Sequence, residues 1–160
     1  MTPLTYVLLI IFPLVTYGQD TTFLKAGRNY EISAVKDGYH LVVYARYKGS
    51  VDTVFWYQYG GYLGVTIIDA IIYKNHFICV YQMDEIAVCK THRYVDHQWV
   101  NSAGGIVFFF NRKYYKLDEF SLKKNVIRLQ SGDRAFKYKI NFDKNILERV
   151  WYKNGDEKKN

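Results

Sequence analysis

Two cysteines and two histidines have the types and spacing that could support chemistry in this sequence. Cys79 and Cys89 lie in ICVYQMDEIAVCK, and His92 and His97 follow in CKTHRYVDHQW. Four such ligands can hold zinc, but zinc sites usually draw on tight, repeated pairs, and that spacing is missing here. The alternatives are a disulfide between the two cysteines or a pair of free buried thiols.

The segment between the cysteines has the pattern of a β-hairpin. Two apolar arms flank the polar turn Met83-Asp84-Glu85, whose length is common in hairpins. Folding the segment about Asp84 sets position 79 opposite position 89, where two side chains are close enough to bridge. The sequence therefore predicts a Cys79–Cys89 disulfide if the protein resides in an oxidising compartment.

Other patterns with catalytic potential are weak. Asp96 and His97 form a carboxylate–imidazole pair, but no serine in a glycine-flanked elbow accompanies them. There is no phosphate-binding loop, no GxGxxG and no HExxH. Asp69 lies inside the apolar run GVTIIDAIIY. We interpret it as a charge on an edge strand, which discourages pairing with another chain, rather than as a buried group with a partner. We predict no enzyme, catalytic residue, metal site or cofactor.

The N-terminus indicates the compartment. Residues 4–15 are apolar apart from Thr5, and the run is shorter than the roughly 20 residues of a spanning helix. Thr16-Tyr17-Gly18 then offers small residues around a bulky one, which is typical of a signal cleavage site. We predict a signal peptide over residues 1–18 and one secreted domain over residues 19–160, with no membrane span. The alternative is an uncleaved anchor or a buried strand.

The composition is typical of a β protein. Of the 160 residues, 18% are aromatic, with 16 Tyr and 10 Phe, and there are only two Pro. Aromatic and β-branched residues suit pleated, half-buried surfaces. The expected strands span residues 29–35, 40–47, 54–59 and 64–73, the two arms around the cysteines, and residues 98–100, 106–110, 136–142 and 147–152.

These short strands at regular spacing predict an all-β fold. The expected architecture is an antiparallel sandwich or a partly closed barrel, with at most one short helix. The segment LDEFSLKK, residues 117–124, is the expected helix.

Positive charge is concentrated in the second half of the chain. Residues 1–80 hold six Lys and Arg against five Asp and Glu, whereas residues 81–160 hold sixteen against ten. Basic positions interleave with tyrosines there, and this surface is the predicted binding site: Arg112, Lys113, Tyr114, Tyr115, Lys116, Lys123, Lys124, Lys137 and Lys139. Outside the cell we expect an acidic extracellular or host protein, or a sulfated glycan, rather than nucleic acid. The alternative is a strand face that lysines only make soluble.

A carrier of an apolar ligand is the second functional hypothesis. Lipocalin-type barrels resemble this chain in size, secretion and strand content, but they carry a Gly-x-Trp near the mature start. That region reads TTFLKAGRNYEISA here, without Trp. The hypothesis depends on the general tendency of small barrels to enclose one ligand.

Several short motifs follow one another between residues 30 and 100: Lys36-Asp37-Gly38-Tyr39, Asp52-Thr53-Val54-Phe55-Trp56, residues 81–90 and Gln98-Trp99. A second, poorer set lies at residues 116–118 and 150–156. The order of these motifs resembles the FAINT domain, a module repeated in secreted proteins of Theileria and related piroplasm parasites. This resemblance implies a secreted or surface-displayed β protein that meets host molecules and has no catalytic residues.

Overall fold

The computed structural model describes residues 20–37, 40–58, 65–110 and 117–153. Within these ranges the chain forms twelve strands and no helix. The strands are β1 (Asp20–Gly27), β2 (Tyr30–Asp37), β3 (His40–Tyr47), β4 (Ser50–Gln58), β5 (Val65–Tyr73), β6 (His76–Met83), β7 (Ile86–Val95), β8 (Gln98–Phe109), β9 (Glu119–Lys123), β10 (Val126–Ser131), β11 (Arg134–Asn141) and β12 (Ile146–Lys153).

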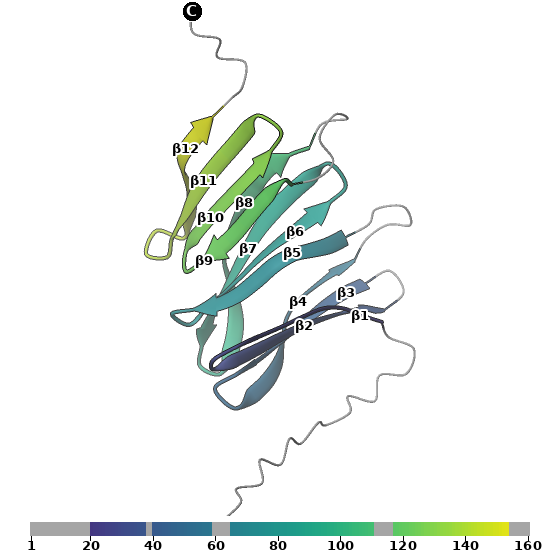
Figure 1. The fold of residues 1–160 in the computed structure, drawn as a ribbon. Coiled ribbons are helices and arrows are strands. Elements are labelled where there is room, and N and C mark those ends of the chain that lie inside the picture. The colour runs from purple at the N-terminus through teal and green to yellow at the C-terminus, as the bar shows by residue number, and fades with distance from the viewer. Residues whose placement is uncertain (1–19, 38–39, 59–64, 111–116, 154–160) are drawn as a thin grey trace, which may run out of the picture.

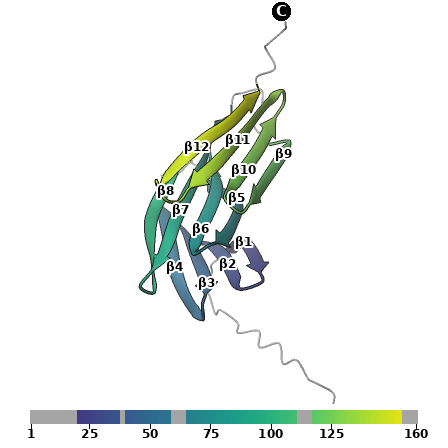
Figure 2. The ribbon, with the colours of Figure 1, turned by 90° about the vertical axis from the view of Figure 1, so that its left-hand side faces the viewer.

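The strands form three four-stranded antiparallel sheets. In each sheet, every strand pairs with its neighbours in the chain, so each sheet is a simple meander. We call them the N-terminal sheet (β1–β4), the central sheet (β5–β8) and the C-terminal sheet (β9–β12). Figures 1 and 2 show the central sheet between the other two.

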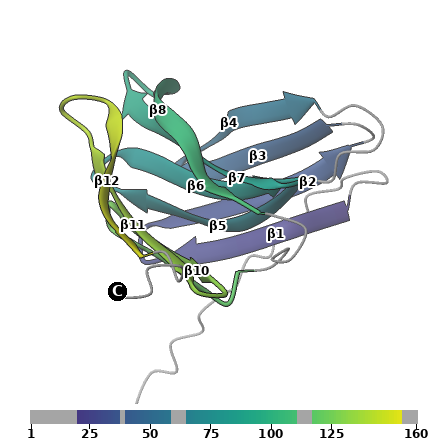
Figure 3. The ribbon, with the colours of Figure 1, turned by 90° about the horizontal axis from the view of Figure 1, so that it is seen from above.

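The central sheet is covered on both faces. Its strands β5 and β8 lie against β1 and β4 of the N-terminal sheet, and against β9 and β12 of the C-terminal sheet. Figure 3 shows the three sheets from above, with the C-terminal sheet at the lower left. Six consecutive residues of β6, from His76 to Tyr81, are buried. A strand buried on both faces is expected to be apolar throughout, and FICVY meets that expectation.

Two hydrophobic cores follow from this stacking, one on each side of the central sheet. Alternate residues along β6 enter different cores, because successive side chains of a strand point to opposite faces. The core toward the N-terminal sheet includes Ile32, Leu41, Val43, Phe55, Phe77, Cys79 and Tyr81. The core toward the C-terminal sheet includes Ile78, Val80, Cys89, Phe108, Leu122, Ile127, Leu129, Phe136, Tyr138 and Ile140.

The structure confirms the predicted all-β antiparallel sandwich, in three layers, and none of the three sheets closes into a barrel. The helix expected over residues 117–124 is wrong, because residues 119–123 form β9. Leu122 is buried in the core while Lys123 is exposed, and β9 pairs with β10 along its whole length. Pairing and burial outweigh the weak helical preference of this short segment.

The predicted disulfide is wrong, because the hairpin register differs from the expected one. The turn contains two residues, Asp84 and Glu85, and Met83 pairs with Ile86. Cys79 therefore lies opposite Lys90, and Cys89 lies opposite Val80. A shift of one residue reverses the face of every side chain, so the two buried thiols are free and belong to different cores.

The register also separates the alternative zinc ligands. Cys79 and His92 lie on the face of the central sheet toward the N-terminal sheet, whereas Cys89 lies on the opposite face. His97 is exposed in the β7–β8 turn, where Asp96 and His97 both have positive φ. Two-residue turns with positive φ match the twist of the strands that they join.

An ion pair joins the N-terminal and central sheets at one edge. The Lys25 ammonium on β1 contacts the Asp69 carboxylate on β5, which also accepts a hydrogen bond from the Ala70 N–H at 2.8 Å. Asp69 follows a bulge at Ile68 in an edge strand. The residue is thus at a sheet edge, as expected, and it also has a partner.

Each core contains one buried histidine from the central sheet, stacked on a phenylalanine. The His92 ring lies parallel to that of Phe55, with centroids 5.5 Å apart. The His76 ring lies 4.0 Å from that of Phe142, which follows β11. Burial lowers the pKa of both imidazoles, and His92 reaches about 4, with the Lys90 ammonium acting in the same direction. The neutral rings therefore serve as packing groups.

We predict that both cysteines resist thiol reagents in the native protein. Burial raises the pKa of both thiols, to about 12 for Cys89, and excludes the reagent. Ellman's reagent should report both thiols promptly in guanidinium chloride and label the native protein at least about 100-fold more slowly. A denatured chain without reactive thiols, with an intact mass matching a cross-linked species, would contradict the register.

We predict that acid weakens the fold through His92. Its pKa is about 4 when folded and 6.5 when unfolded, so from pH 6.5 down to 4 the unfolded state binds a proton that the folded state does not. The free energy of unfolding should fall over this window by about 3 kcal/mol from this group. Urea denaturation at several pH values measures the fall, which should shrink in His92→Phe and persist in the control His97→Phe. Equal falls in the two variants would contradict the assignment.

Candidate binding face

The structure brings together part of the predicted basic surface. Lys123 ends β9, Lys124 lies in the β9–β10 turn, and Lys137 and Lys139 lie on β11. All four belong to the C-terminal sheet or its turns. The other predicted residues, Arg112 to Lys116, lie outside the described residues.

Alternation along the strands directs these lysines to the outer face of the sheet. Their neighbours Leu122, Phe136, Tyr138 and Ile140 are buried in the core toward the central sheet. Since successive residues of a strand point to opposite faces, Lys123, Lys137 and Lys139 face outward. The exposed fractions agree for Lys123 and Lys139, and Lys137 is half-buried.

Two cross-strand rows organise this outer face. In the first row, Ser121, Arg128, Lys137 and Trp151 follow one another across β9, β10, β11 and β12. In the second row, Lys123, Val126, Lys139 and Glu148 do the same. Directly paired residues lie on the same face, about 5 Å apart. We call the set Lys123, Arg128, Lys137, Lys139 and Trp151 the basic face.

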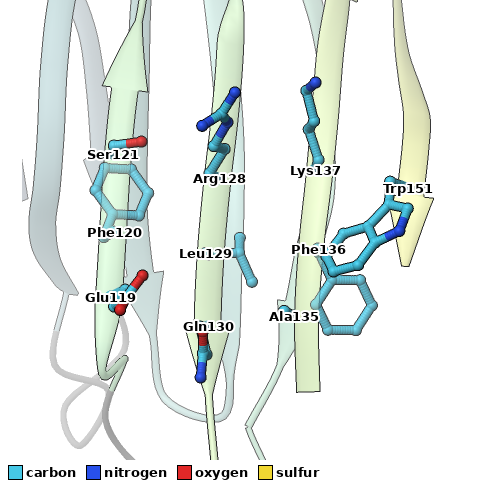
Figure 4. Close-up of a pocket in the computed structure, with 10 residues that line it drawn as sticks. All are labelled: Glu119, Phe120, Ser121, Arg128, Leu129, Gln130, Ala135, Phe136, Lys137 and Trp151. Atoms are coloured by element: carbon cyan, nitrogen blue, oxygen red, sulfur yellow. The ribbon is translucent and has the colours of Figure 1, made fainter. Parts of the chain in front are cut away.

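A shallow hollow lies on the basic face. Its volume is about 410 Å³, and its lining includes Arg128, Lys137 and Trp151, with the small side chains Ser121 and Ala135 between the larger ones. Figure 4 shows Arg128 and Lys137 extending in the same direction from neighbouring strands, with the Trp151 indole on the next strand. The side chain of Trp151 is half exposed, at 50%.

The cations of the basic face lack ion-pair partners within the described part of the chain. The ion pairs of those residues join Lys25 to Asp69 and Arg46 to Glu31, both far from this face. Glu148 is the nearest acid in the rows, and its carboxylate accepts a hydrogen bond from the Asn141 amide at 3.1 Å. Of these cations, Arg128 and Lys137 line the hollow, and Glu119 also lines it. None of the three forms an ion pair with another described residue.

This arrangement is suited to binding an anion that carries a flat apolar surface. Guanidinium and ammonium groups donate charge-assisted hydrogen bonds to sulfate or carboxylate. The indole adds a rigid apolar plate on which a sugar ring or another flat group can pack.

Two members of the basic face were not among the predicted binding residues. Arg128 lies in VIRLQS, where Ile127 and Leu129 are buried and the alternate residues are polar or less buried. That alternation could have indicated a strand with Arg128 on its outer face. Trp151 was expected on a strand, but a bulge between Arg149 and Trp151 reverses the facing of the residues beyond it, and alternation alone could not fix its side.

A comparison with models of known protein families and with curated proteins finds no match to this chain. The resemblance to the FAINT domain therefore stays a prediction.

The residues that the structure describes contain no helix long and apolar enough to cross a bilayer.

We predict that the fluorescence of Trp151 is quenched more by anions than by cations, because of the positive charge of the basic face. Iodide should quench the protein's tryptophan fluorescence more than caesium does, because Arg128 and Lys137 attract the anion to the exposed indole and repel the cation. Stern–Volmer titrations at low ionic strength measure the difference, which should largely disappear in Trp151→Phe and decrease in Arg128→Gln/Lys137→Gln. Equal quenching by both ions in the unmodified protein would contradict the geometry.

Proposed function

We propose that this protein is a secreted binding protein that recognises a sulfated glycan through the basic face. The observation that carries the proposal is a set of four cations without ion-pair partners among the described residues, which share one sheet face with a half-exposed tryptophan that pairs with Lys137. A cationic patch with an aromatic plate complements a sugar chain that displays sulfate groups.

The shape of the face favours a linear polymer over a small ion. The cations of the two rows lie on β9, β10 and β11, so the positive charges are spread over roughly 10 Å at the usual strand spacing. A polysaccharide with regularly repeated sulfates can contact both rows at once, whereas one inorganic sulfate contacts one or two side chains. An acidic protein face, the other predicted partner class, lacks such regular spacing.

Secretion is part of the proposal and depends on the sequence pattern of residues 1–18. The chain has the apolar core and the small-residue cleavage pattern of a signal peptide. Sulfated glycans belong to the extracellular space that such a protein would enter. The two free thiols neither require nor exclude that compartment, because both are buried.

The alternative of a barrel carrier has less support. A lipocalin-like carrier holds its ligand inside a closed barrel, whereas the three sheets here are open. The two spaces between the sheets are filled by buried aliphatic and aromatic side chains.

The decisive experiment measures heparin binding by calorimetry at several salt concentrations. Arg128→Gln/Lys137→Gln/Lys139→Gln should weaken binding by about 100-fold, from about 1 kcal/mol for each exposed charge-assisted contact, and should flatten the salt dependence. Trp151→Ala should weaken binding at all salt concentrations, because its contribution is not ionic.

A matched control removes the same charges elsewhere. Arg28→Gln/Lys36→Gln/Lys48→Gln takes one arginine and two lysines of similar exposure from the N-terminal sheet and its turns. This variant should bind heparin with an affinity within a few-fold of the unmodified protein. If the two triple variants lose equal affinity, the binding follows net charge alone and the proposal fails.

A further inference from the structure

The six turns that join each odd-numbered strand to the next strand lie at one end of the sandwich (Figure 1). Contacts between the sheets bring these turns together. Asn75 in the β5–β6 turn accepts a hydrogen bond at 2.5 Å from the hydroxyl of Tyr47, the last residue before the β3–β4 turn. Phe142 in the β11–β12 turn stacks on His76, the first residue after the β5–β6 turn. We call this part of the molecule the turn end.

The turn end carries an excess of positive charge. Five of its six turns contain an exposed lysine or arginine, and these residues are Arg28, Lys48, Lys74, Lys124 and Lys144. The acids of the same turns are Asp96 and Asp143. None of the five cations forms an ion pair with another described residue. The turn end therefore attracts anions.

A hollow of about 410 Å³ lies at the turn end. Its lining comes from the β5–β6 turn, the start of β6, the β9–β10 turn, the end of β11 and the β11–β12 turn, so two sheets build it. Lys74, His76, Phe142 and Asp143 belong to this lining, and so does Lys139 of the basic face. We call it the end hollow.

His76 contributes a buried nitrogen without a partner. The residue is 9% exposed, and its Nδ1 lies 2.8 Å from the Lys74 carbonyl oxygen. Because a carbonyl oxygen can only accept, Nδ1 carries the hydrogen, and the neutral ring keeps a lone pair on Nε2. Nε2 is buried and has no hydrogen-bond partner among the described residues. Such an acceptor is destabilising, and a ligand that brings a hydrogen would satisfy it.

The groups around His76 favour the neutral imidazole. Tyr73 and Arg93 pair directly with His76 on the two neighbouring strands, so all three side chains lie on the same face. Burial lowers the pKa of His76, and the Arg93 charge acts in the same direction. The hydrogen bond to the Lys74 carbonyl and the Asp143 charge act in the opposite direction, but the net shift is downward. At pH 7 the ring therefore accepts at Nε2 rather than donates.

We propose that the end hollow binds the phosphate group of a phosphomonoester. The P–OH of the singly protonated phosphate donates a hydrogen bond to Nε2 of His76, and the other phosphate oxygens accept from Lys74 and Arg93. A phosphomonoester loses this proton at about pH 6, close enough to neutrality for the proton to be shared with an imidazole. A sulfate ester carries no such proton. The bare nitrogen thus selects phosphate over sulfate.

Binding requires a small rearrangement, since Nε2 is covered in the free protein. The Phe142 ring stacks on the imidazole with centroids 4.0 Å apart and belongs to a turn, so this side chain is placed to shift and admit the phosphate. The end hollow is separate from the hollow of the basic face, which Arg128, Lys137 and Trp151 line. Substitutions can therefore address each hollow alone.

The test compares methyl phosphate with methyl sulfate, which have similar size and differ in the proton. Calorimetry on the full-length protein at pH 7 should show one methyl phosphate bound per chain and at least about tenfold weaker binding of methyl sulfate. The affinity for methyl phosphate should fall about tenfold per pH unit above pH 7, because the complex holds one proton that neither free partner retains. Equal binding of methyl sulfate, or an affinity independent of pH, would overturn the proposal.

Variants locate the site. Lys74→Gln should weaken methyl phosphate binding about tenfold, whereas the matched control Lys48→Gln should leave it unchanged. Both lysines are exposed, open a two-residue turn with a φ of 48° or 50°, and follow a tyrosine that their ammonium approaches. His76→Phe keeps an aromatic ring against Phe142 and should abolish both the pH dependence and the preference over methyl sulfate. Equal losses in the two lysine variants, or an unchanged pH dependence in folded His76→Phe, would overturn the assignment.

The phosphate group can come from a soluble phosphomonoester or from the headgroup of a phosphatidate lipid. Sedimentation with phosphatidylcholine vesicles that contain phosphatidate, compared with phosphatidylglycerol, distinguishes these sources, since phosphatidylglycerol is a diester without the proton. Retention by phosphatidate vesicles alone would assign the lipid headgroup. Binding of methyl phosphate without retention by either vesicle would assign a soluble ligand. Equal retention by both vesicles without binding of methyl phosphate would overturn the proposal. Arg128→Gln should weaken heparin binding and change none of these results.

Discussion

The structure depends on a central sheet that has no solvent-facing side. Because flanking sheets cover both faces, most residues of its inner strands must suit one of two cores, and β6 is buried over six consecutive residues. The register between β6 and β7 decides which side chain enters which core. The two-residue turn at Asp84 and Glu85 sets that register, so the length of one turn determines the composition of both cores.

Open sheets leave edges, and the edge strands differ from the inner ones. Register shifts occur where β1, β4, β5, β8 and β12 pair with their neighbours, and each of these is an edge strand. The described inner pairs, β2–β3, β6–β7 and β10–β11, are regular. Bulges interrupt the row of free backbone groups that would otherwise template pairing with another chain. The sixth edge, β9, is short and carries Glu119 and Lys123 at its ends.

Sequence patterns predicted the class of the fold better than its details. Aromatic content and the alternation over residues 136–142 correctly indicated strands, and β11 covers most of that range. The strand over residues 20–27 was not predicted, and residues 117–124 were assigned to a helix. The disulfide prediction failed because hairpin pairing alternates in face, and an error of one residue in the turn separates two cysteines that otherwise would meet.

For the candidate sites too, some residues could be predicted from sequence and others could not. Lys137 and Lys139 could be predicted because they alternate with apolar residues within one local strand, whereas Lys123 was expected in the helix that proved to be β9. Arg134 and Arg149 line a hollow that also involves β8 of the central sheet, and this neighbourhood could not be predicted from sequence. A site assembled from two layers depends on how the layers stack, and strand periodicity carries no information on stacking.

The meander topology has a consequence for how the chain reaches its native state. Every strand pairs with a strand next to it in sequence, so each sheet can assemble by successive hairpin closures, which take microseconds and need no distant segment. Only the docking of completed sheets joins remote parts of the chain. A polypeptide that emerges N-terminus first could therefore build its layers in order, each new meander covering the exposed apolar face of the one before it. The outer face of the last layer carries lysines instead of an apolar surface, so no further sheet needs to cover it.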